Sequence, residues 1–341
     1  MPTIADFVTR LEGFLEEKTR SPVHVLAAHQ LAGGASRDTW GVDVNVATGP
    51  EAGRHSYVVR RDCGGTITDD ALSREQEFRL LEIVFNAGVM VARPRWVCTD
   101  PAVLGAPFLV VDRLEGESVG RRVVRDASLA EARARLPRQM GEQLAKIHAV
   151  TLSAALDFLP RPDAGESPAS CAVEGCAQQL WRLGEPHPPL ELSLRWLRKY
   201  APPCDESVLV HGDFRLGNLM VGPDGLACIF DWEFAHVGDP GEDLAWPCVR
   251  SWRFGNDQLR LAGIAAPDEF WTAYREHIGR SVDAFRLRYW EILGNFRWAV
   301  GCIAQANRHL SGQAKSIEFA SLGRRTAEME LELLDLIAAT T

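Results

Sequence analysis

The stretch His211-Gly-Asp-Phe-Arg-Leu-Gly-Asn218, followed by Asp231-Trp-Glu233, constrains this chain more than any other. Between the two segments lie apolar runs at 219–221 and 226–230, separated by a turn sequence, Gly222-Pro-Asp-Gly225. This pattern predicts a β-hairpin. Because a hairpin brings its two ends side by side, we expect Asn218 and Asp231 to lie close enough to share one cation.

The polar residues of these segments are suited to phosphoryl transfer. Asp213 lies in a loop that leaves the apolar run 208–210, where its carboxylate can accept the proton of an attacking hydroxyl. Asn218 and Asp231 offer the hard oxygen ligands that Mg²⁺ prefers. Asp231 follows the apolar run 227–230, and a carboxylate there costs free energy unless it is paired or metal-bound. The spacing therefore predicts a base and two metal ligands.

Other polar residues of the same region have more structural interpretations. We expect His211 to hydrogen-bond the loop backbone, and Glu233 to form a salt bridge. Arg215 has two interpretations that the sequence leaves open. It can stabilise the charge of the transferred phosphoryl group, or it can form a structural ion pair.

A helix start is predicted immediately downstream. In Asp239-Pro-Gly-Glu-Asp243, Asp239 is the expected N-cap, Pro240 the first helical residue and Glu242 the reciprocal capping partner. Asp243 is then predicted to brace the catalytic loop by hydrogen bonding.

Candidates for the nucleotide site lie in the first hundred residues. The adjacent Gly33 and Gly34 allow backbone N–H groups to approach phosphate, and Ser36 adds a hydroxyl donor. The alternative is a glycine-rich hairpin turn. Arg60 is predicted to hold the nucleotide phosphates, with Glu77 on the following helix as its ion-pair partner; the alternative is ordinary surface charge.

The pattern of apolar residues predicts a strand-rich N-terminal lobe (1–113), a hinge at about 111–117 and a larger helical lobe (114–341), with a binding cleft between the lobes. A loop rich in Pro, Gly, Ser and Asp is predicted at 159–170. The expected helices are 3–17, 71–85, 128–150, 190–200, 240–250, 267–279, 282–310 and 315–338, and the expected strands of the first lobe are 23–31, 39–46, 56–61, 95–98 and 107–112.

Charge, hydropathy and cysteine content argue against a nucleic-acid partner, a membrane span and a secreted protein. A formal net charge of −9 over 341 residues argues against a nucleic-acid partner, which requires a basic surface. No run of about 18 apolar residues predicts a membrane span, and the N-terminus lacks the pattern of a secretory signal. Eight scattered cysteines without a C-x-x-C pair favour reduced thiols in the cytoplasm.

Taken together, these motifs resemble the aminoglycoside phosphotransferase family of small-molecule kinases, over nearly the whole chain. The most specific match is His211-x-Asp213-x-x-x-x-Asn218 with Asp231-Trp-Glu233 and the following Gly-Asp-Pro-x-x-Asp-Leu-Ala. The resemblance implies an α+β, protein-kinase-like two-lobe fold, ATP and Mg²⁺ as cofactors, and Asp213 as the base. It also implies that Asn218 and Asp231 hold Mg²⁺.

The resemblance further implies that backbone from about Val111 to Leu114, including Asp112, contacts adenine. One departure is informative, because the family's usual strand lysine is replaced by Arg60. We associate this change with the branch that resembles acyl-CoA dehydrogenase-linked phosphotransferases. That resemblance implies hydroxylated substrates, which are often apolar or CoA-linked. An arginine fork can still bind phosphate, and bidentately.

The sequence therefore predicts an ATP- and Mg²⁺-dependent O-phosphotransferase acting on a small-molecule hydroxyl. Abundant aromatic residues in the C-terminal half favour an apolar or aromatic alcohol, whereas the negative net charge would suit an aminoglycoside. A nucleotide-binding pseudokinase is an alternative, because Arg60 replaces the lysine. A hydrolase built on His211, Asp213 and Asp231 would leave Asn218 without a role.

Overall fold

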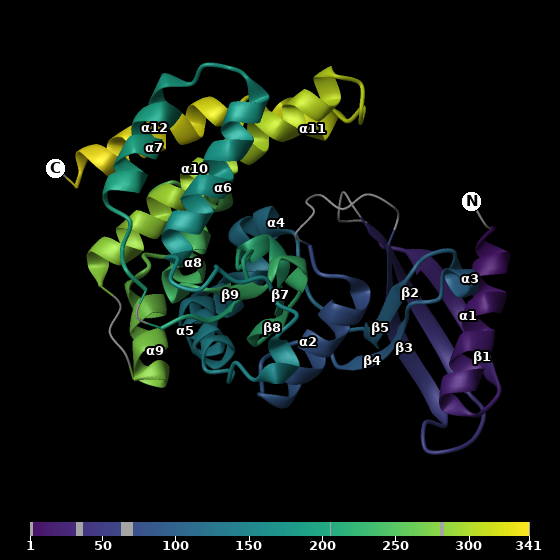
Figure 1. Cartoon of the computed structure of the whole chain (residues 1–341). Helices are drawn as coiled ribbons and strands as arrows, with labels where there is room; N and C mark the ends of the chain where they lie inside the picture. The colour runs from purple at the N-terminus through teal and green to yellow at the C-terminus, as the bar shows by residue number, and fades with distance from the viewer. Residues whose placement is uncertain (1–2, 32–36, 63–70, 205, 280–282, 341) are drawn as a thin grey trace. The chain divides into compact units, whose positions relative to one another are not determined.

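The computed structural model describes residues 3–31, 37–62, 71–204, 206–279 and 283–340 (Figure 1). The chain divides into two compact units, Met1–Gly116 with Ala227–Phe234, and Glu117–Leu226 with Ala235–Thr341. The first unit thus includes a segment that follows it by about a hundred residues in the sequence. The lobe boundaries at 113 and 114 and the hinge at 111–117 stay predictions.

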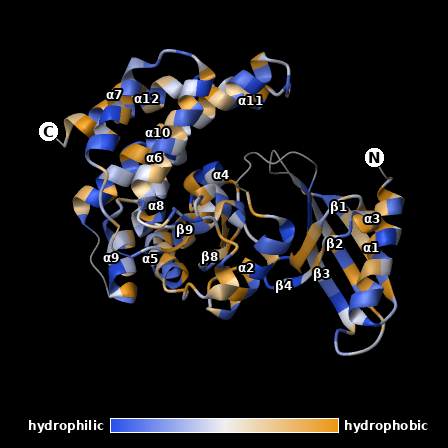
Figure 2. Cartoon of the chain, in the orientation of Figure 1, coloured by the Kyte–Doolittle hydropathy of each residue, from blue (hydrophilic) through white to orange (hydrophobic). Residues whose placement is uncertain are grey.

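The first unit is built on a five-stranded antiparallel sheet in the order β1-β2-β3-β5-β4. Its helix α1 begins after the cap Thr3 and buries Phe7, Leu11 and Phe14 in the core that it shares with the sheet. Hydrophobic and hydrophilic residues recur along α1 in Figure 2, as expected of an amphipathic helix. The elements of this unit are α1 (Ile4–Thr19), β1 (Val23–Gln30), β2 (Arg37–Val46), β3 (Gly53–Asp62), α2 (Arg74–Asn86), β4 (Pro94–Cys98), α3 (Pro101–Leu104) and β5 (Phe108–Asp112).

The strands β2 and β3 are longer than the sequence predicts. Their ladder runs from Arg37 opposite Asp62 to Val46 opposite Gly53. Each of these strands has a neighbour on both sides, so backbone pairing extends them beyond their apolar residues. The register places Arg60 at the centre of the sheet, opposite Thr39 on β2 and Leu109 on β5.

The second unit is mainly helical. Its core packs residues of α6, α7, α10 and α12, including Trp196, Trp290 and Phe296. The short strands β6 and β9 pair antiparallel, and β7 pairs with β8. Its helices are α4 (Gly120–Arg125), α5 (Ala130–His148), α6 (Pro168–Leu183), α7 (Pro188–Lys199), α8 (Pro240–Ala245), α9 (Asp268–Ile278), α10 (Ala284–Leu310), α11 (Ile317–Leu322) and α12 (Arg325–Ala338), and its strands are β6 (Val208–Val210), β7 (Leu219–Gly222) and β9 (His236–Gly238). The strand β8 (Gly225–Ile229) begins in this unit and ends in the segment Ala227–Phe234 of the first unit.

Three helices differ from the sequence prediction. The region 159–170 is not entirely a loop, because α6 begins at Pro168, which occupies its first turn, and ends at Gly184 with a left-handed backbone. The helix predicted at 240–250 ends at Ala245 and continues as short 3₁₀ turns, since Pro247 cannot supply a helical N–H. The helix predicted at 315–338 is broken near Gly323 into α11 and α12.

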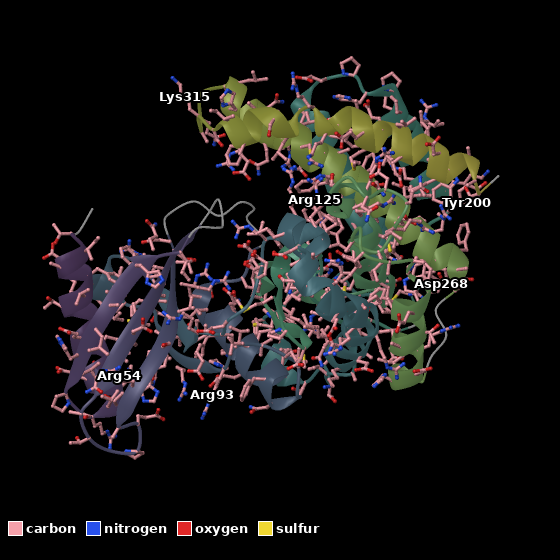
Figure 3. The ribbon with its side chains drawn as sticks, turned by 180° about the vertical axis from the view of Figure 1, so that it is seen from behind. Arg54, Arg93, Arg125, Tyr200, Asp268 and Lys315 are labelled. Atoms are coloured by element: carbon pink, nitrogen blue, oxygen red, sulfur yellow. The ribbon has the colours of Figure 1, made fainter. Side chains whose placement is uncertain are left out.

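Charged residues occupy exposed positions in both units. The labelled side chains in Figure 3, Arg54 and Lys315 among them, belong to exposed residues. Within the residues that the structure describes, no helix is long and apolar enough to cross a membrane. The seven cysteines in the described ranges are free thiols.

Candidate active site

The loop that carries Asp213, the candidate base, leaves the buried strand β6, which β9 holds in place through the pair Val210 and His236. Gly212 has a φ of 79°, a left-handed conformation that favours glycine. The Asp213 N–H donates to His211 Nδ1 at 3.2 Å, and the His211 side chain is buried. The structural role predicted for His211 is therefore confirmed.

Asp243 of α8 holds the loop backbone. Its carboxylate accepts hydrogen bonds from the N–H groups of His211 at 2.7 Å and Gly212 at 3.0 Å. It also lies 3.2 Å from His148 Nε2 on α5, whose Nδ1 is 2.8 Å from the hydroxyl of Tyr274 on α9. Burial alone would raise the pKa of Asp243, but the hydrogen bond and charge of His148 and the charge of His211 lower it. The predicted brace is confirmed, and the connection to His148 and Tyr274 was not predicted.

The Asp213 carboxylate is held by three side chains. Arg215 Nε donates to Oδ1 at 2.9 Å, and the indole N–H of Trp246 donates to the same oxygen at 2.7 Å. Asn218 Nδ2 donates to Oδ2 at 2.6 Å. The Asp213 residue is only 8% exposed. The sequence left a structural ion pair open for Arg215 without naming its partner, and it predicted neither the contact of Asn218 with Asp213 nor that of Trp246.

These contacts orient the neighbours of Asp213. The Asn218 amide nitrogen also donates to the backbone oxygen of Asp213 at 3.0 Å, so the amide oxygen is directed away from this residue. Arg215 lies over the ring of Trp252, at 4.7 Å from its centroid. Of the two interpretations of Arg215, the structure contains the ion pair, formed with Asp213. A role in stabilising phosphoryl charge stays a prediction.

The first unit contains the second group of site residues. Arg60 Nη1 donates to Glu77 Oε1 at 2.8 Å, and Nη2 donates to Asp231 Oδ1 at 2.8 Å. The predicted ion pair with Glu77 is present, whereas the link to Asp231 was not predicted. Burial alone would lower the pKa of Arg60, but the charges of Glu77 and Asp231 raise it above its ordinary value. Arg60 is therefore a permanent cation between two carboxylates, and Glu77 also pairs with Arg74.

Asp231 has an unusual backbone conformation. Its φ is 70°, the left-handed region that residues other than glycine adopt at a cost of about 1–3 kcal/mol. It follows β8, and its side chain is about one quarter exposed. Such strain is common in residues held for function.

The helix start at α8 agrees with the sequence prediction in one respect and differs in another. Asp239 caps the helix, accepting from the Gly241 N–H at 2.7 Å, and it also pairs with Arg286. Glu242 is not the reciprocal capping partner. It contacts Arg297 Nη1 at 2.7 Å and His236 Nε2 at 3.1 Å, because an arginine cation together with a ring N–H stabilises a buried carboxylate more than one backbone N–H does.

In the segment predicted to contact adenine, Asp112 already has partners within the chain for its backbone N–H and its carboxylate. The Asp112 N–H donates to the carbonyl oxygen of Arg93 at 3.0 Å, and the Asp112 carboxylate pairs with Arg95. Val111 is buried in β5, and Leu114 is exposed. The predicted phosphate-loop residues Gly33, Gly34 and Ser36 lie outside the described residues.

The donors Asn218 and Asp231 suit a magnesium ion. Both provide oxygen ligands, and one is a carboxylate in a strained, partly exposed position. Among the described residues, no cluster of three or more His, Cys, Asp or Glu side chains forms a metal site. Each of these donors is of a type that fits Mg²⁺, which is commonly held by one or two protein ligands together with nucleotide phosphates.

Residues 27–278 match the phosphotransferase enzyme family. The chain belongs to this family. It is 26% identical to acyl-CoA dehydrogenase family member 10 of Mus musculus, over 94% of this chain and 30% of the relative, and 28% identical to acyl-CoA dehydrogenase family member 11 of Gallus gallus, over 95% and 42%. The predicted branch is confirmed. The chain spans less than half the length of these curated relatives.

Solved structures identify the fold. A protein of Ralstonia eutropha JMP134 described as an aminoglycoside phosphotransferase has a TM-score of 0.75 at 22% identity, covering 96% of this chain and 97% of that chain. A GDP and kanamycin complex of an aminoglycoside 2″-phosphotransferase has a TM-score of 0.60 at 14% identity, covering 96% and 98%. The α+β, protein-kinase-like fold class predicted from the sequence is confirmed.

Proposed function

We propose that this phosphotransferase-family chain is an ATP- and Mg²⁺-dependent O-phosphotransferase acting on a small-molecule hydroxyl. The observation that carries the proposal is the Asp213 carboxylate, which is buried and oriented by Asn218, Arg215 and Trp246. Asp243 fixes the backbone of the same loop. A base held in this way can orient an acceptor hydroxyl and take its proton.

The charges of the first unit support the nucleotide half of the proposal. Arg60, fixed by Glu77, offers a planar guanidinium that matches phosphate oxygens, and Asp231 with Asn218 would hold Mg²⁺. When bound, Mg²⁺ neutralises developing phosphate charge. The GDP complex of the kanamycin-binding neighbour supports nucleotide binding in this fold.

The reaction follows from these roles. The acceptor oxygen attacks the γ-phosphorus in line, and the bond from phosphorus to the β–γ bridging oxygen breaks. Asp213 receives the hydroxyl proton, and ADP leaves with the electron pair of the broken bond. No phosphoenzyme is needed, because the acceptor itself is the nucleophile.

The buried carboxylates of the second unit favour an uncharged, apolar, aromatic or CoA-linked alcohol as the acceptor. A polycationic aminoglycoside needs carboxylates that remain available to its amines. Among the described residues, each buried acid of this unit already has a basic partner: Asp213 with Arg215, Asp239 with Arg286, Glu242 with Arg297, Asp243 with His148, Glu291 with Arg253 and Glu332 with Arg250. The relatives named as acyl-CoA dehydrogenases support the CoA-linked form.

The proposal is tested by measuring ATP consumption over panels of hydroxyacyl-CoAs, aromatic alcohols and aminoglycosides. The variant Asp213→Asn should lower turnover by about 10²–10⁴ while ATP still raises the melting temperature. Asp257→Asn, which changes an exposed acid paired with Arg250, serves as the matched control and should retain turnover.

Three outcomes would contradict parts of the proposal. Full turnover by Asp213→Asn with a true acceptor would exclude Asp213 as the base. ATP-dependent stabilisation without turnover of any alcohol would indicate a pseudokinase. Turnover of aminoglycosides alone would refute the proposed acceptor class.

A further inference from the structure

Trp246 contacts the proposed catalytic base through a single polar atom. Its indole N–H donates to Asp213 Oδ1 at 2.7 Å, a distance typical of a hydrogen bond to a charged acceptor. Trp246 is 6% exposed and lies in the 3₁₀ turn that follows α8. A buried indole donor facing a buried carboxylate is a specific pairing, because the donor cannot rotate away without losing its partner.

The position of Trp246 is linked to that of Asp243. Asp243 lies on α8 three residues earlier, where it holds the backbone N–H groups of His211 and Gly212. Residues three apart on a helical turn share one face. The same short segment therefore fixes the main chain of the catalytic loop through Asp243 and its side chain through Trp246.

The indole ring is itself held in place. The ring of Trp252 lies 5.6 Å from that of Trp246, and the Arg297 guanidinium lies 5.4 Å from its centroid. A Cβ on Gly294 of α10 would come within 3.4 Å of the indole, so α10 passes close to the ring there. With its ring confined by these neighbours, Trp246 is a rigid donor.

The donors around Asp213 are distributed over its two carboxylate oxygens. Arg215 and Trp246 both donate to Oδ1, whereas Asn218 donates to Oδ2 at 2.6 Å. Without the indole N–H, Oδ1 would depend on Arg215, whose longer side chain also bonds Oδ2 at 3.2 Å. The rotation of the carboxylate would then be less well defined.

We propose that Trp246 is a positioning residue that fixes the orientation of the Asp213 carboxylate through its indole N–H. The inference rests on the proposed function of Asp213 as the base. It adds a residue that lies outside the catalytic loop, on the segment that also carries Asp243.

The test compares Trp246→Phe with Trp290→Phe. Trp290 is also a buried tryptophan of the helical core, but within the described residues its indole nitrogen has no hydrogen-bond partner. Both substitutions remove the same atoms, and only the first removes a donor to Asp213. We expect Trp246→Phe to lower kcat by about 10- to 100-fold with the KM for ATP changed by less than about twofold. Trp290→Phe should keep the wild-type kcat.

Side-chain NMR tests the same inference without turnover. The indole N–H signal of Trp246, assigned by its absence in Trp246→Phe, should move in Asp213→Asn, while the Trp290 signal stays in place. The side-chain amide signals of Asn218 should move in Trp246→Phe, because the carboxylate that they contact has lost a donor.

The outcomes separate the two proposals. Equal kcat values for Trp246→Phe and Trp290→Phe, or an indole signal that ignores Asp213→Asn, would overturn the role of Trp246. If the wild-type protein phosphorylates no acceptor, the proposed function fails. In that case, the Asn218 amide signals in Trp246→Phe still decide whether Trp246 orients Asp213.

Discussion

The buried carboxylate of Asp243 offers a quantitative test of how the loop that carries Asp213 is held. In Asp243→Asn the side chain keeps its shape but loses its charge and one acceptor oxygen. The amide of the new Asn can take two orientations. In one, its oxygen accepts from the N–H of His211, and its NH₂ group points at the N–H of Gly212. In the other, its oxygen accepts from Gly212, and its NH₂ group points at the N–H of His211 and at Nε2 of His148. At least one buried donor is therefore left without an acceptor.

The magnitude follows from these contacts. A buried donor left unpaired costs about 1–3 kcal/mol, and each hydrogen bond to a charged acceptor is worth about 1.5–3 kcal/mol. We expect Asp243→Asn to lower the free energy of unfolding by about 3–5 kcal/mol. For a unit of this size, that corresponds to a melting temperature lower by roughly 6–20 °C.

The effect should depend on pH in a defined direction. The pKa of Asp243 lies below its ordinary value in the folded chain, so the folded state binds fewer protons at this carboxyl than the unfolded state. The stabilisation is fully present above the unfolded pKa of about 3.9 and is lost as the pH falls through the folded pKa. The difference between wild type and variant should stay constant from about pH 7.5 to 5 and narrow below about pH 4.

Urea denaturation followed by circular dichroism measures this difference, with Asp257→Asn as the matched control. Asp257 is 42% exposed on its side chain and pairs with Arg250, so its loss should cost less than about 1 kcal/mol. The reasoning would be refuted if Asp243→Asn lost no more free energy of unfolding than the control. It would also be refuted if the stability difference between wild type and Asp243→Asn widened as the pH falls.

Two further variants test the nucleotide site and the packing of the helices. Arg60→Met removes the cation between Glu77 and Asp231. The rise in melting temperature caused by ATP should then become smaller, by an amount equivalent to about a tenfold weaker Kd for ATP. An unchanged rise would exclude Arg60 from phosphate binding. Gly141→Ala in α5 should cost about 1–3 kcal/mol, because the new methyl group would meet backbone atoms of Phe270 and Tyr274 on α9. Gly175→Ala, at an open position of α6, should instead stabilise by up to about 1 kcal/mol, and thermal melts that rank the two alike would contradict this packing.

Local sequence patterns predicted the parts of the site that depend on local geometry. The N-cap at Asp239 and the brace at Asp243 follow from their spacing on one short helix. The pair of Arg60 with Glu77 follows from strand alternation and from the helix that comes next. Such interactions are encoded over a few residues, or between consecutive elements. There the side-chain periodicities of the helix and of the strand determine directly which residues share a face.

Contacts between distant segments could not be predicted in this way. Trp246 lies 33 residues from Asp213, and Asp231 lies 171 residues from Arg60. Glu242 matches a capping pattern, yet Arg297, 55 residues away, takes its carboxylate. A buried charge gains more from a charged partner than from a neutral N–H, so tertiary packing overrode the local motif. The sequence contains no signal that indicates which distant arginine will pair with Glu242.

The net charge of the chain illustrates the same limit at the level of function. An excess of acidic residues suggested a carboxylate-lined pocket for a cationic acceptor. In the described part of the second unit, however, each buried acid pairs with an arginine or a histidine, as Glu291 does with Arg253 and Arg260. The other acids in this described part lie at partly or fully exposed positions, where solvent and salt screen their charge. Net charge consequently says little about the acceptor, and the pairing of individual buried carboxylates is the property that bears on substrate class.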